Sequence, residues 1–548
     1  MESQRSLLFI ALMVVTYLLF SQWQLDNAPA VQTPAQSTTI ENVSSNSDYI
    51  PQASEHTTSP TDKIVTNATL IDIKTNVLEL KVNTQGGDIV EAKLLKYDTE
   101  LNNGVPFTLM QNRTYTYIAQ SGLIGSNGID QIIAGRPIYS TTATNFTFND
   151  NQQELIVDLT YQDENALSVI KRLTFSKNGY SVKVDYIITN HTNNNANVQL
   201  YGQLKQTIDI PKKSNGMPTS AYRGAAYATD EDRYNKFKFN DFEDEKINIS
   251  TKDGWVAMIQ HYFVAAWIPK DSGENQLYSN YTQNGEAIIG FKEPPLTIAA
   301  NSTANTSAII YIGPKDQNKM AKIADGLDLT IDYGFLFMIS QPLFWLLTHI
   351  FDIVGNWGIA IIVITLIVKG GMYPLTKVQY TSMARMRELQ PKMAALKERF
   401  GDDRQKMSQA TMALYKKEKV NPAGGCFPLL LQMPIFLALY WVFLESVELR
   451  HAPFFLWIQD LSAMDPYYVM PVLMGISMFV MQKMQPVTVQ DPMQQKIMKY
   501  MPVVFSVFMA WFPSGLVLYW FISNLISITQ MKIIFSGIAK KKALASAK

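Results

Sequence analysis

Apolar and polar positions alternate with a period of two through the first half of the chain. The segment 179-GYSVKVDYIITN-190 follows this alternation, and Asn178-Gly179 before it suits a hairpin turn. The segments 77-VLELKVN-83 and 154-ELIVDLTYQ-162 have the same pattern. Recurring short strands of this kind predict a large antiparallel β-sandwich over residues 62–325.

The pattern changes after residue 333, and apolar runs dominate as far as residue 535. The run 334–357 is interrupted by Pro342, His349 and Asp352, so we expect it to lie as a helix at a membrane interface. The region 358–535 is predicted to be a five-span helical core. Its candidate spans are 358–375, 427–444, 467–483, 497–512 and 515–534.

The first 23 residues form a sixth candidate span. One Arg precedes an apolar stretch of about 14 to 17 residues, a length that suits a signal peptide or a short anchor. The Ala-Pro-Ala at 28–30 lies well beyond this stretch, so we expect an uncleaved anchor over 1–23. Residues 24–61 are rich in Gln, Ser, Thr, Asn and Pro, which predicts a flexible linker.

Lys and Arg residues determine the expected orientation. They are frequent in the connection 377–420, and the tail 536–548 is also basic. Because short cytoplasmic connections are enriched in Lys and Arg, six spans with both termini in the cytoplasm fit the sequence. The β-sandwich then lies on the opposite side, in a periplasm-like compartment.

The connection 377–420 has a helical pattern of its own. Apolar residues recur at intervals of three and four up to Phe400, and Gly401 is expected to end this first helix. Asp402, with Gln405 three residues later, is expected to start a second helix through a capping box. The predicted hairpin is rich in Met. Its Met residues either pack the two helices together or form an adaptable surface for apolar segments or a ribosomal partner.

Composition excludes several functions. The 47 Lys+Arg balance 47 Asp+Glu, so no overall positive charge favours a sequence-specific nucleic-acid partner. Cys426 is the single cysteine, so an intramolecular disulfide is impossible. The sandwich lacks paired metal-ligand spacing, a nucleophile elbow and a phosphate-binding glycine loop. We therefore expect it to bind or scaffold, with no metal or cofactor.

One charge stands inside a candidate span, at Lys369 in 361-IIVITLIVKGGMYPL-375. Burying an ammonium in hydrocarbon costs several kcal/mol, so such a residue either escapes the bilayer or has a function there. Thr365, Lys369 and Thr376 share one face of a helix, which indicates a polar stripe. The alternative is that the long side chain reaches the interface, since Pro374 lies only roughly 8 Å further along the helix.

Several motifs together resemble the YidC/Oxa/Alb family of membrane protein insertases, in its Gram-negative form. The motifs are SQRSLLFIAL at the start, 84-TQGGDIVEA-92, 222-YRGAAYATDE-231, 253-DGWVAMIQHYFVAAWIP-269, 334-GFLFMISQPLFWLL-347, 372-MYPLTKVQYTSM-383, 420-VNPAGGCFPLLLQMPIFLALY-440, 491-DPMQQKIM-498 and 511-WFPSGLVLYW-520. The resemblance implies a bacterial inner-membrane protein whose periplasmic supersandwich resembles sugar mutarotases without their activity. It also implies that nascent membrane proteins are inserted without nucleotide or metal, alone or beside the Sec translocon, with ribosome and signal-recognition components as further partners.

The resemblance also implies where substrate is held. In this family the five spans surround a hydrophilic groove with one basic residue, and Lys369 falls at that position, where the family most often has arginine. A lysine could lose its proton if it were dry, so the substitution predicts a wet groove. The implied substrate-contact residues are Lys369, Thr365, Gln432, Met433, Phe436, Phe508, Phe512, Tyr519 and Trp520.

Two other classes of function are compatible with the sequence. An ion or solute transporter could also use an intramembrane charge such as Lys369, although the spans show no inverted repeat. A receptor-like scaffold would depend on the sandwich. Deleting residues 62–310 separates this class from an insertase, whose membrane part should retain much of its activity.

Overall fold

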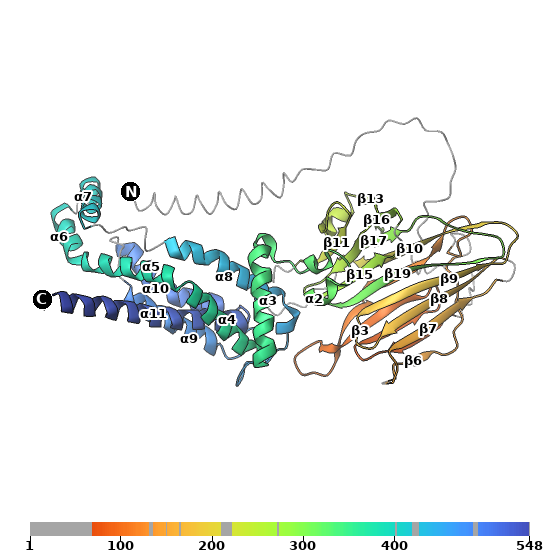
Figure 1. Cartoon of the computed structure of the whole chain (residues 1–548), viewed down its shortest axis with the longest axis horizontal. Helices are drawn as coiled ribbons and strands as arrows, with labels where there is room; N and C mark the ends of the chain where they lie inside the picture. The colour runs from red at the N-terminus through yellow and green to blue at the C-terminus, as the bar shows by residue number, and fades with distance from the viewer. Residues whose placement is uncertain are drawn as a thin grey trace, which may run out of the picture.

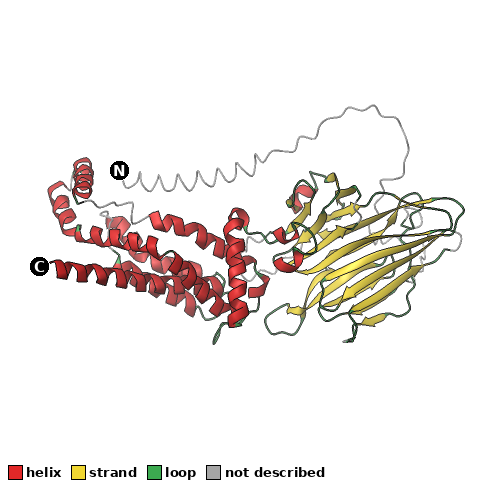
Figure 2. Ribbon diagram, viewed as in Figure 1, coloured by secondary structure: helices red, strands yellow, loops and turns green. Residues whose placement is uncertain are grey.

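The computed structural model describes residues 68–130, 135–149, 151–163, 166–209, 222–270, 273–400, 403–418, 427–485 and 492–546. The predicted anchor 1–23 and linker 24–61 lie outside these ranges. The described chain forms an all-β domain followed by a helical region, with helix α3 between the two (Figures 1 and 2). The predicted fold class is therefore confirmed.

The β-domain contains two large sheets. The first has the order β13-β16-β17-β10-β5-β4-β3-β2-β1-β6, with β18 paired to β10. Its strands are β1 (Leu70–Lys74), β2 (Leu78–Asn83), β3 (Asp88–Asp98), β4 (Pro106–Asn112), β5 (Thr116–Ile124), β6 (Asn145–Thr147), β10 (Ala196–Thr207), β13 (Asn248–Thr251), β16 (Asn275–Tyr281), β17 (Glu286–Lys292) and β18 (Leu296–Ile298).

The second sheet has the order β12-β11-β14-β15-β19-β9-β8-β7. Its strands are β7 (Glu154–Tyr161), β8 (Leu167–Ser176), β9 (Ser181–Asn190), β11 (Gly224–Ala228), β12 (Asn235–Lys238), β14 (Trp255–Ile259), β15 (Phe263–Pro269) and β19 (Thr303–Pro314). Strands are predicted correctly at 77–83, 154–162 and 179–190, where β2, β7 and β9 occur. Buried and partly exposed residues alternate along β9, as expected for a strand with one face on the core.

A polar group is buried inside the β-domain. The ammonium of Lys171 on β8 donates hydrogen bonds to the carbonyls of Gly86 (3.0 Å), Gly87 (2.8 Å) and Ser121 (3.1 Å). Both glycines have positive φ, 75° and 64°, a conformation that L side chains rarely adopt. The turn between β2 and β3 thus presents two carbonyls to the second sheet.

Two carboxylates complete this group. Arg136 forms ion pairs with Asp88 and, at 2.9 Å, with Asp130. Burial lowers the pKa of Lys171 to about 7, and the charges of Asp88 and Asp130 oppose that shift. Buried polar groups need partners, and Lys171 has one carbonyl acceptor for each of its three N–H bonds.

A connector of residues 315–333 leads from β19 to the helical region. It contains the short helices α2 (Gln317–Met320) and η3 (Leu327–Thr330), and η4 (Gly334–Leu336) follows it. Met320 and Leu327 are fully buried, and Arg233 and Lys236 of the β-domain pair with Asp325 and Asp332 of the connector. The connector is therefore packed on the β-domain.

The helical region begins with α3 and continues to the end of the described chain. Its helices are α3 (Phe337–Val354), α4 (Trp357–Gly371), α5 (Tyr373–Glu388), α6 (Gln390–Phe400), α7 (Arg404–Lys417), α8 (Phe427–Glu445), α9 (Val469–Met484), α10 (Pro492–Met509) and α11 (Ser514–Ser546). Figure 1 shows α3 running across the direction of α4, α8 and α11.

Helices occur at each predicted C-terminal span, but several are short. By length and apolar composition, Gly334–Val354 and Ser514–Lys540 qualify as spans among the described helices, and α4 with α5 qualifies if that bent pair is counted as one. The pair bends by 66° at Met372. Pro374 stands in the first turn of α5, where proline needs no backbone N–H.

The connection after α4 differs from the prediction in three ways. The first predicted helix is broken at Leu389 into α5 and α6, because Pro391 begins a new helix. Met383 packs with Tyr380 against Met531 and Ile534 of α11 and not in a hairpin seam. The second helix starts one residue later than predicted, because Asp403 accepts the hydrogen bond from the Lys406 N–H.

Candidate functional site

Lys369 lies in the last turn of α4 and points toward α11. Asn356 caps the start of this helix by accepting a hydrogen bond from the Ile359 N–H. The ammonium of Lys369 donates to the Ser527 hydroxyl at 3.1 Å, and the residue is only 7% exposed. The side chain is therefore directed into the bundle, toward α11.

Lys369 has few polar partners for a buried cation. None of the Asp and Glu side chains in the described ranges forms an ion pair with it. The Gln530 amide donates to the Lys369 backbone carbonyl at 3.3 Å, and Thr365 is fully buried with its hydroxyl bonded to the Ile361 carbonyl at 2.5 Å. The Gln530 side-chain oxygen is buried without a hydrogen-bond partner among the described residues.

The polar side chains of α11 were missed in the sequence. Ser523, Ser527 and Gln530 are buried at offsets of four and seven, and Asn524 beside them donates to the Ser477 hydroxyl of α9 at 3.0 Å. The same spacing rule that singled out Thr365 and Lys369 would have found them in the run 515–534. We call Thr365, Lys369, Ser527 and Gln530 the polar cluster.

Thr376 does not extend the polar cluster along α4. It was predicted to share one helix face with Thr365 and Lys369, but α4 ends at Gly371. Thr376 belongs to α5, beyond the 66° bend, and its hydroxyl donates to the Met372 carbonyl at 3.1 Å. The predicted stripe is wrong at this residue because Pro374 starts a new helix.

Aromatic side chains meet where α8, α10 and α11 pack. Phe436 of α8 lies 4.4 Å from Trp520 and 6.2 Å from Tyr519, measured between ring centroids. Phe508 lies 4.9 Å from Phe512. Phe505, which the sequence did not single out, joins the two groups, with its ring 4.6 Å from Trp520 and 6.3 Å from Phe508. These six rings form the aromatic cluster.

The structure thus brings the predicted residues together in two groups. Tyr519 and Ser527 are eight residues apart on α11, which places the aromatic and polar clusters roughly 12 Å apart along the helix. Met433 and Phe508 are 45% and 42% exposed, so an apolar surface is open beside the aromatic cluster. Gln432 is half-buried on α8.

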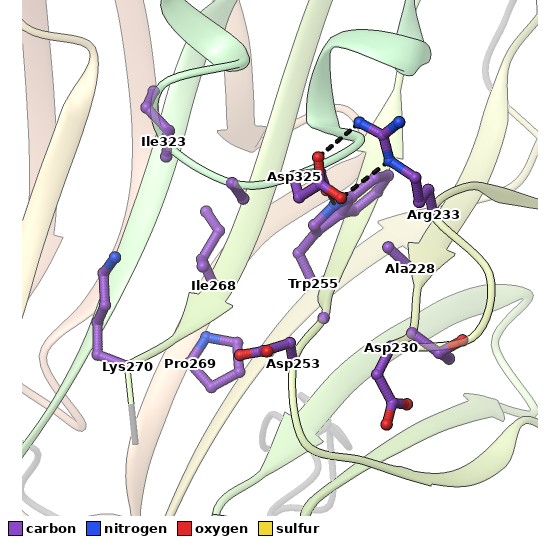
Figure 3. Close-up of a pocket in the computed structure, with 13 residues that line it drawn as sticks. Ala228, Asp230, Arg233, Asp253, Trp255, Ile268, Pro269, Lys270, Ile323 and Asp325 are labelled. Atoms are coloured by element: carbon purple, nitrogen blue, oxygen red, sulfur yellow. Dashed lines mark hydrogen bonds and ion pairs between the residues drawn. The ribbon is translucent and has the colours of Figure 1, made fainter. Parts of the chain in front are cut away.

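The β-domain has a pocket of about 460 Å³ between β11, β14 and the connector (Figure 3). Its wall includes Trp255, whose indole N–H donates to the Asp325 carbonyl at 2.9 Å. Asp325 is already paired with Arg233, while Lys270 stands on the opposite side. The polar groups of this pocket do not converge on one point, so the polar and aromatic clusters are the stronger candidate site.

Comparison with known proteins covers nearly the whole chain. Residues 70–346 match the family model described as the YidC periplasmic domain, and residues 349–542 match the 60Kd inner membrane protein model. The chain is 51% identical over 543 residues to "Membrane protein insertase YidC" of Shewanella baltica (strain OS195), covering 99% of both chains. It is 50% identical over 547 residues to the protein of that name from Aeromonas hydrophila, again covering 99% of both.

Two solved structures are similar in part. A crystal structure of active YidC insertase with its first transmembrane domain resolved is 20% identical and covers 84% of this chain and 90% of its own, with a TM-score of 0.38. A galactose mutarotase related enzyme from Lactobacillus acidophilus is 9% identical and covers 44% of this chain and 97% of its own, with a TM-score of 0.31.

Proposed function

The chain belongs to the YidC family of membrane protein insertases, and we propose that it inserts and folds inner-membrane proteins, alone or with the Sec translocon, by holding a polar client segment at Lys369. The observation that most directly supports this proposal is that the ammonium of Lys369 is buried beside one hydroxyl and forms no ion pair in the described part of the chain. A buried cation of this kind favours an incoming carboxylate.

The polar cluster is the proposed holding site. An acidic or polar tail of the client enters from the cytoplasm and pairs transiently with Lys369, beside Ser527 and Gln530. The buried oxygen of Gln530 can accept a hydrogen bond from the client backbone, because it has no partner among the described residues. The pairing lowers the cost of carrying the tail across, and water reaching the cluster keeps Lys369 protonated.

The aromatic cluster is the proposed sliding surface for the client's apolar segment. Met433 and Phe508 present exposed apolar groups beside Phe436 and Trp520, so a segment can leave the protein for lipid along this wall. Each Leu, Ile, Phe or Val near the bilayer centre contributes about 0.3 to 0.6 kcal/mol. The membrane potential adds about 2.3 kcal/mol per charge per 100 mV for an acidic tail that moves outward. These two terms drive insertion without nucleotide.

The proposed topology has six spans, formed by the N-terminal segment and α4, α8, α9, α10 and α11. We place both termini in the cytoplasm. Helix α3 is long and apolar enough to span a membrane, but we place it at the periplasmic interface because it runs across the direction of the other helices (Figure 1). The 15 residues of α4 span only roughly 22 Å, less than the about 30 Å of a bilayer core. A locally thinned bilayer would shorten the path of the client tail.

Substitution of Lys369 tests this function. Insertion of a short single-span protein with an acidic outer tail is followed in proteoliposomes for Lys369→Arg, Lys369→Ala and Lys369→Glu. Arg should insert the client well, while Ala and Glu should slow insertion by at least about tenfold, equivalent to about 1.4 kcal/mol. Lys532→Ala, at an exposed position of α11, is the matched control and should insert normally.

Two outcomes would contradict the proposal. Normal insertion by both Lys369→Ala and Lys369→Glu would exclude the charge-based mechanism. Ion or solute flux through the wild-type protein, measured in the same proteoliposomes without any client, would favour a transporter. A second client whose acidic tail residues are replaced by Asn and Gln should insert at rates that depend little on residue 369.

A further inference from the structure

An ion pair joins the connector to the helical region. The ammonium of Lys315, directly after β19, lies 2.8 Å from a carboxylate oxygen of Glu445, the last residue of α8. The two side chains are 2% and 1% exposed. Lys315 also lies 3.4 Å from the Thr330 carbonyl. Residues that are 130 positions apart are thus held together out of contact with water.

Other contacts surround this pair. His261 of the β-domain donates from Nε2 to the Leu444 carbonyl at 2.9 Å. Burial lowers the pKa of His261 below its usual range, so the imidazole is neutral near pH 7 and does not neutralise Glu445, whose nearer oxygen is 4.0 Å away. Among the described residues, Lys315 is therefore the cation that compensates this buried carboxylate.

A second contact lies on the same face of the helical region. Arg450 donates to the carbonyls of Asp98 (2.6 Å) and Thr99 (3.1 Å) of the β-domain. Its guanidinium lies 5.6 Å from the centre of the Phe107 ring and 5.7 Å from that of Phe263. The β-domain therefore contacts the chain around the end of α8 at two separate points, at Leu444 through His261 and at Arg450.

We call these contacts around Glu445 and Arg450 the joint. Helix α8 links the joint to the aromatic cluster. Phe443, two residues before Glu445, has its ring 6.0 Å from Tyr519 of α11, and Phe436 lies two turns earlier against Tyr519 and Trp520. A displacement of Glu445 along or around the α8 axis moves both rings, because a helix transmits rotation as a rigid rod.

We propose that Lys315 is a positioning residue for client insertion. It acts through Glu445 to hold α8, and with it Phe436 of the aromatic cluster, in place against α11. The inference rests on the proposed function of the aromatic cluster as a sliding surface. It also assigns a role to the connector, because Lys315 lies beyond the strands of the sandwich. A carboxylate left buried without its cation would pull the end of α8 toward water.

The test combines a distance measurement with an insertion assay. Spin labels at Ile156 of β7 and Met433 of α8, in a Cys426→Ser background, report the distance between the β-domain and α8. Insertion is measured with the unlabelled proteins, because Met433 belongs to the proposed sliding surface. Lys315→Met should shift or broaden this distance distribution and slow client insertion by at least about threefold per folded molecule. The Lys315→Met/Glu445→Gln double variant should recover most of the rate, since it leaves no buried charge unpaired.

The control is Lys319→Met, an identical change at an exposed lysine of the same connector, which should alter neither readout. A folded Lys315→Met protein with wild-type distances and wild-type insertion would overturn the proposal, as would a double variant that inserts no faster than the single variant. If Lys315→Met does not fold, Glu445→Gln provides the same comparison. Failure of wild-type insertion would instead refute the proposed function, while the distances still test the joint.

Discussion

Two buried lysines, one in each part of the molecule, have opposite surroundings. Lys171 in the β-domain has three carbonyl acceptors at 2.8 to 3.1 Å and two carboxylates nearby. Lys369 in the helical bundle has one hydroxyl at 3.1 Å and forms no ion pair among the described residues. Complete partnering is what a buried charge needs for stability, whereas the proposed function requires a charge that is incompletely partnered and so available to a client.

The two regions differ in whether their own residues supply all the hydrogen-bond partners of the buried lysine. The β-domain encloses Lys171 between two sheets and supplies a carbonyl acceptor for each of its three N–H bonds, so this lysine has no donor left for another molecule. Among the described residues, the bundle buries the Lys369 ammonium with one hydroxyl partner and the Gln530 side-chain oxygen with none, which destabilises this part of the bundle. A site that binds only transiently has to tolerate this cost, because complete partners inside the protein would compete with the client.

The largest expected effect is on β-domain stability in Lys171→Met. Below the Lys171 pKa of about 7, where the ammonium keeps all three N–H bonds, the substitution removes three hydrogen bonds. Arg136 still donates to the Gly86 and Ser121 carbonyls, whereas the Gly87 carbonyl loses the lysine donor, so the free energy of unfolding should fall by about 1 to 3 kcal/mol. Urea unfolding followed by β-sheet circular dichroism measures this loss. Lys183→Met on the neighbouring strand is exposed and should cost less than about 0.5 kcal/mol. If Lys171→Met lowers the free energy of unfolding no more than Lys183→Met does, Lys171 does not stabilise the β-domain and the comparison with Lys369 fails.

The next effect is the pH dependence of β-domain stability that Lys171 should cause. Burial lowers the pKa of Lys171 from 10.5 to about 7, so between these values the unfolded chain holds a proton that the folded domain has released. Wild-type stability should therefore rise from pH 7 to 9 by up to about 1.4 kcal/mol per pH unit, a slope that Lys171→Met lacks. Parallel stability curves for the two proteins over pH 6 to 9 would contradict this assignment.

A smaller effect of opposite sign is expected at Lys369. Lys369→Met removes a poorly partnered cation, so the melting temperature of the bundle should stay constant or rise by about 2 to 4 °C while client insertion falls. Circular dichroism at the helical band measures the melting, with Lys532→Met as control. If Lys369→Met instead destabilises the bundle as strongly as Lys171→Met destabilises the β-domain, Lys369 is a structural lysine.

From the sequence alone, Lys369 was recognised as a candidate buried charge and Lys171 was not. Lys369 was visible because its span is otherwise apolar, and Lys171 was not, because alternation makes a lysine in a strand look like an outward-facing residue. The strands, the apolar helices and most of the aromatic cluster followed from periodicity and family motifs. The predictions failed at Thr376, where Pro374 starts a new helix, and could not include Lys315–Glu445, since no local pattern pairs residues so far apart in sequence.

The smallest effect is expected at Ser527, the one hydroxyl bonded to Lys369 in the described part of the chain. Ser527→Ala removes a hydrogen bond worth about 0.5 to 1.5 kcal/mol, but a client carboxylate can compensate for it, so insertion should slow by no more than about threefold. The client with neutral tail residues should show no change. Thr529→Ala is the matched control, because Thr529 lies exposed on the same helix and its hydroxyl donates to the Leu525 carbonyl of its own turn. Equal slowing of both clients would mean that Ser527 supports the packing of α11 on α4, and the contrast with Lys171 would then rest on Lys369 alone.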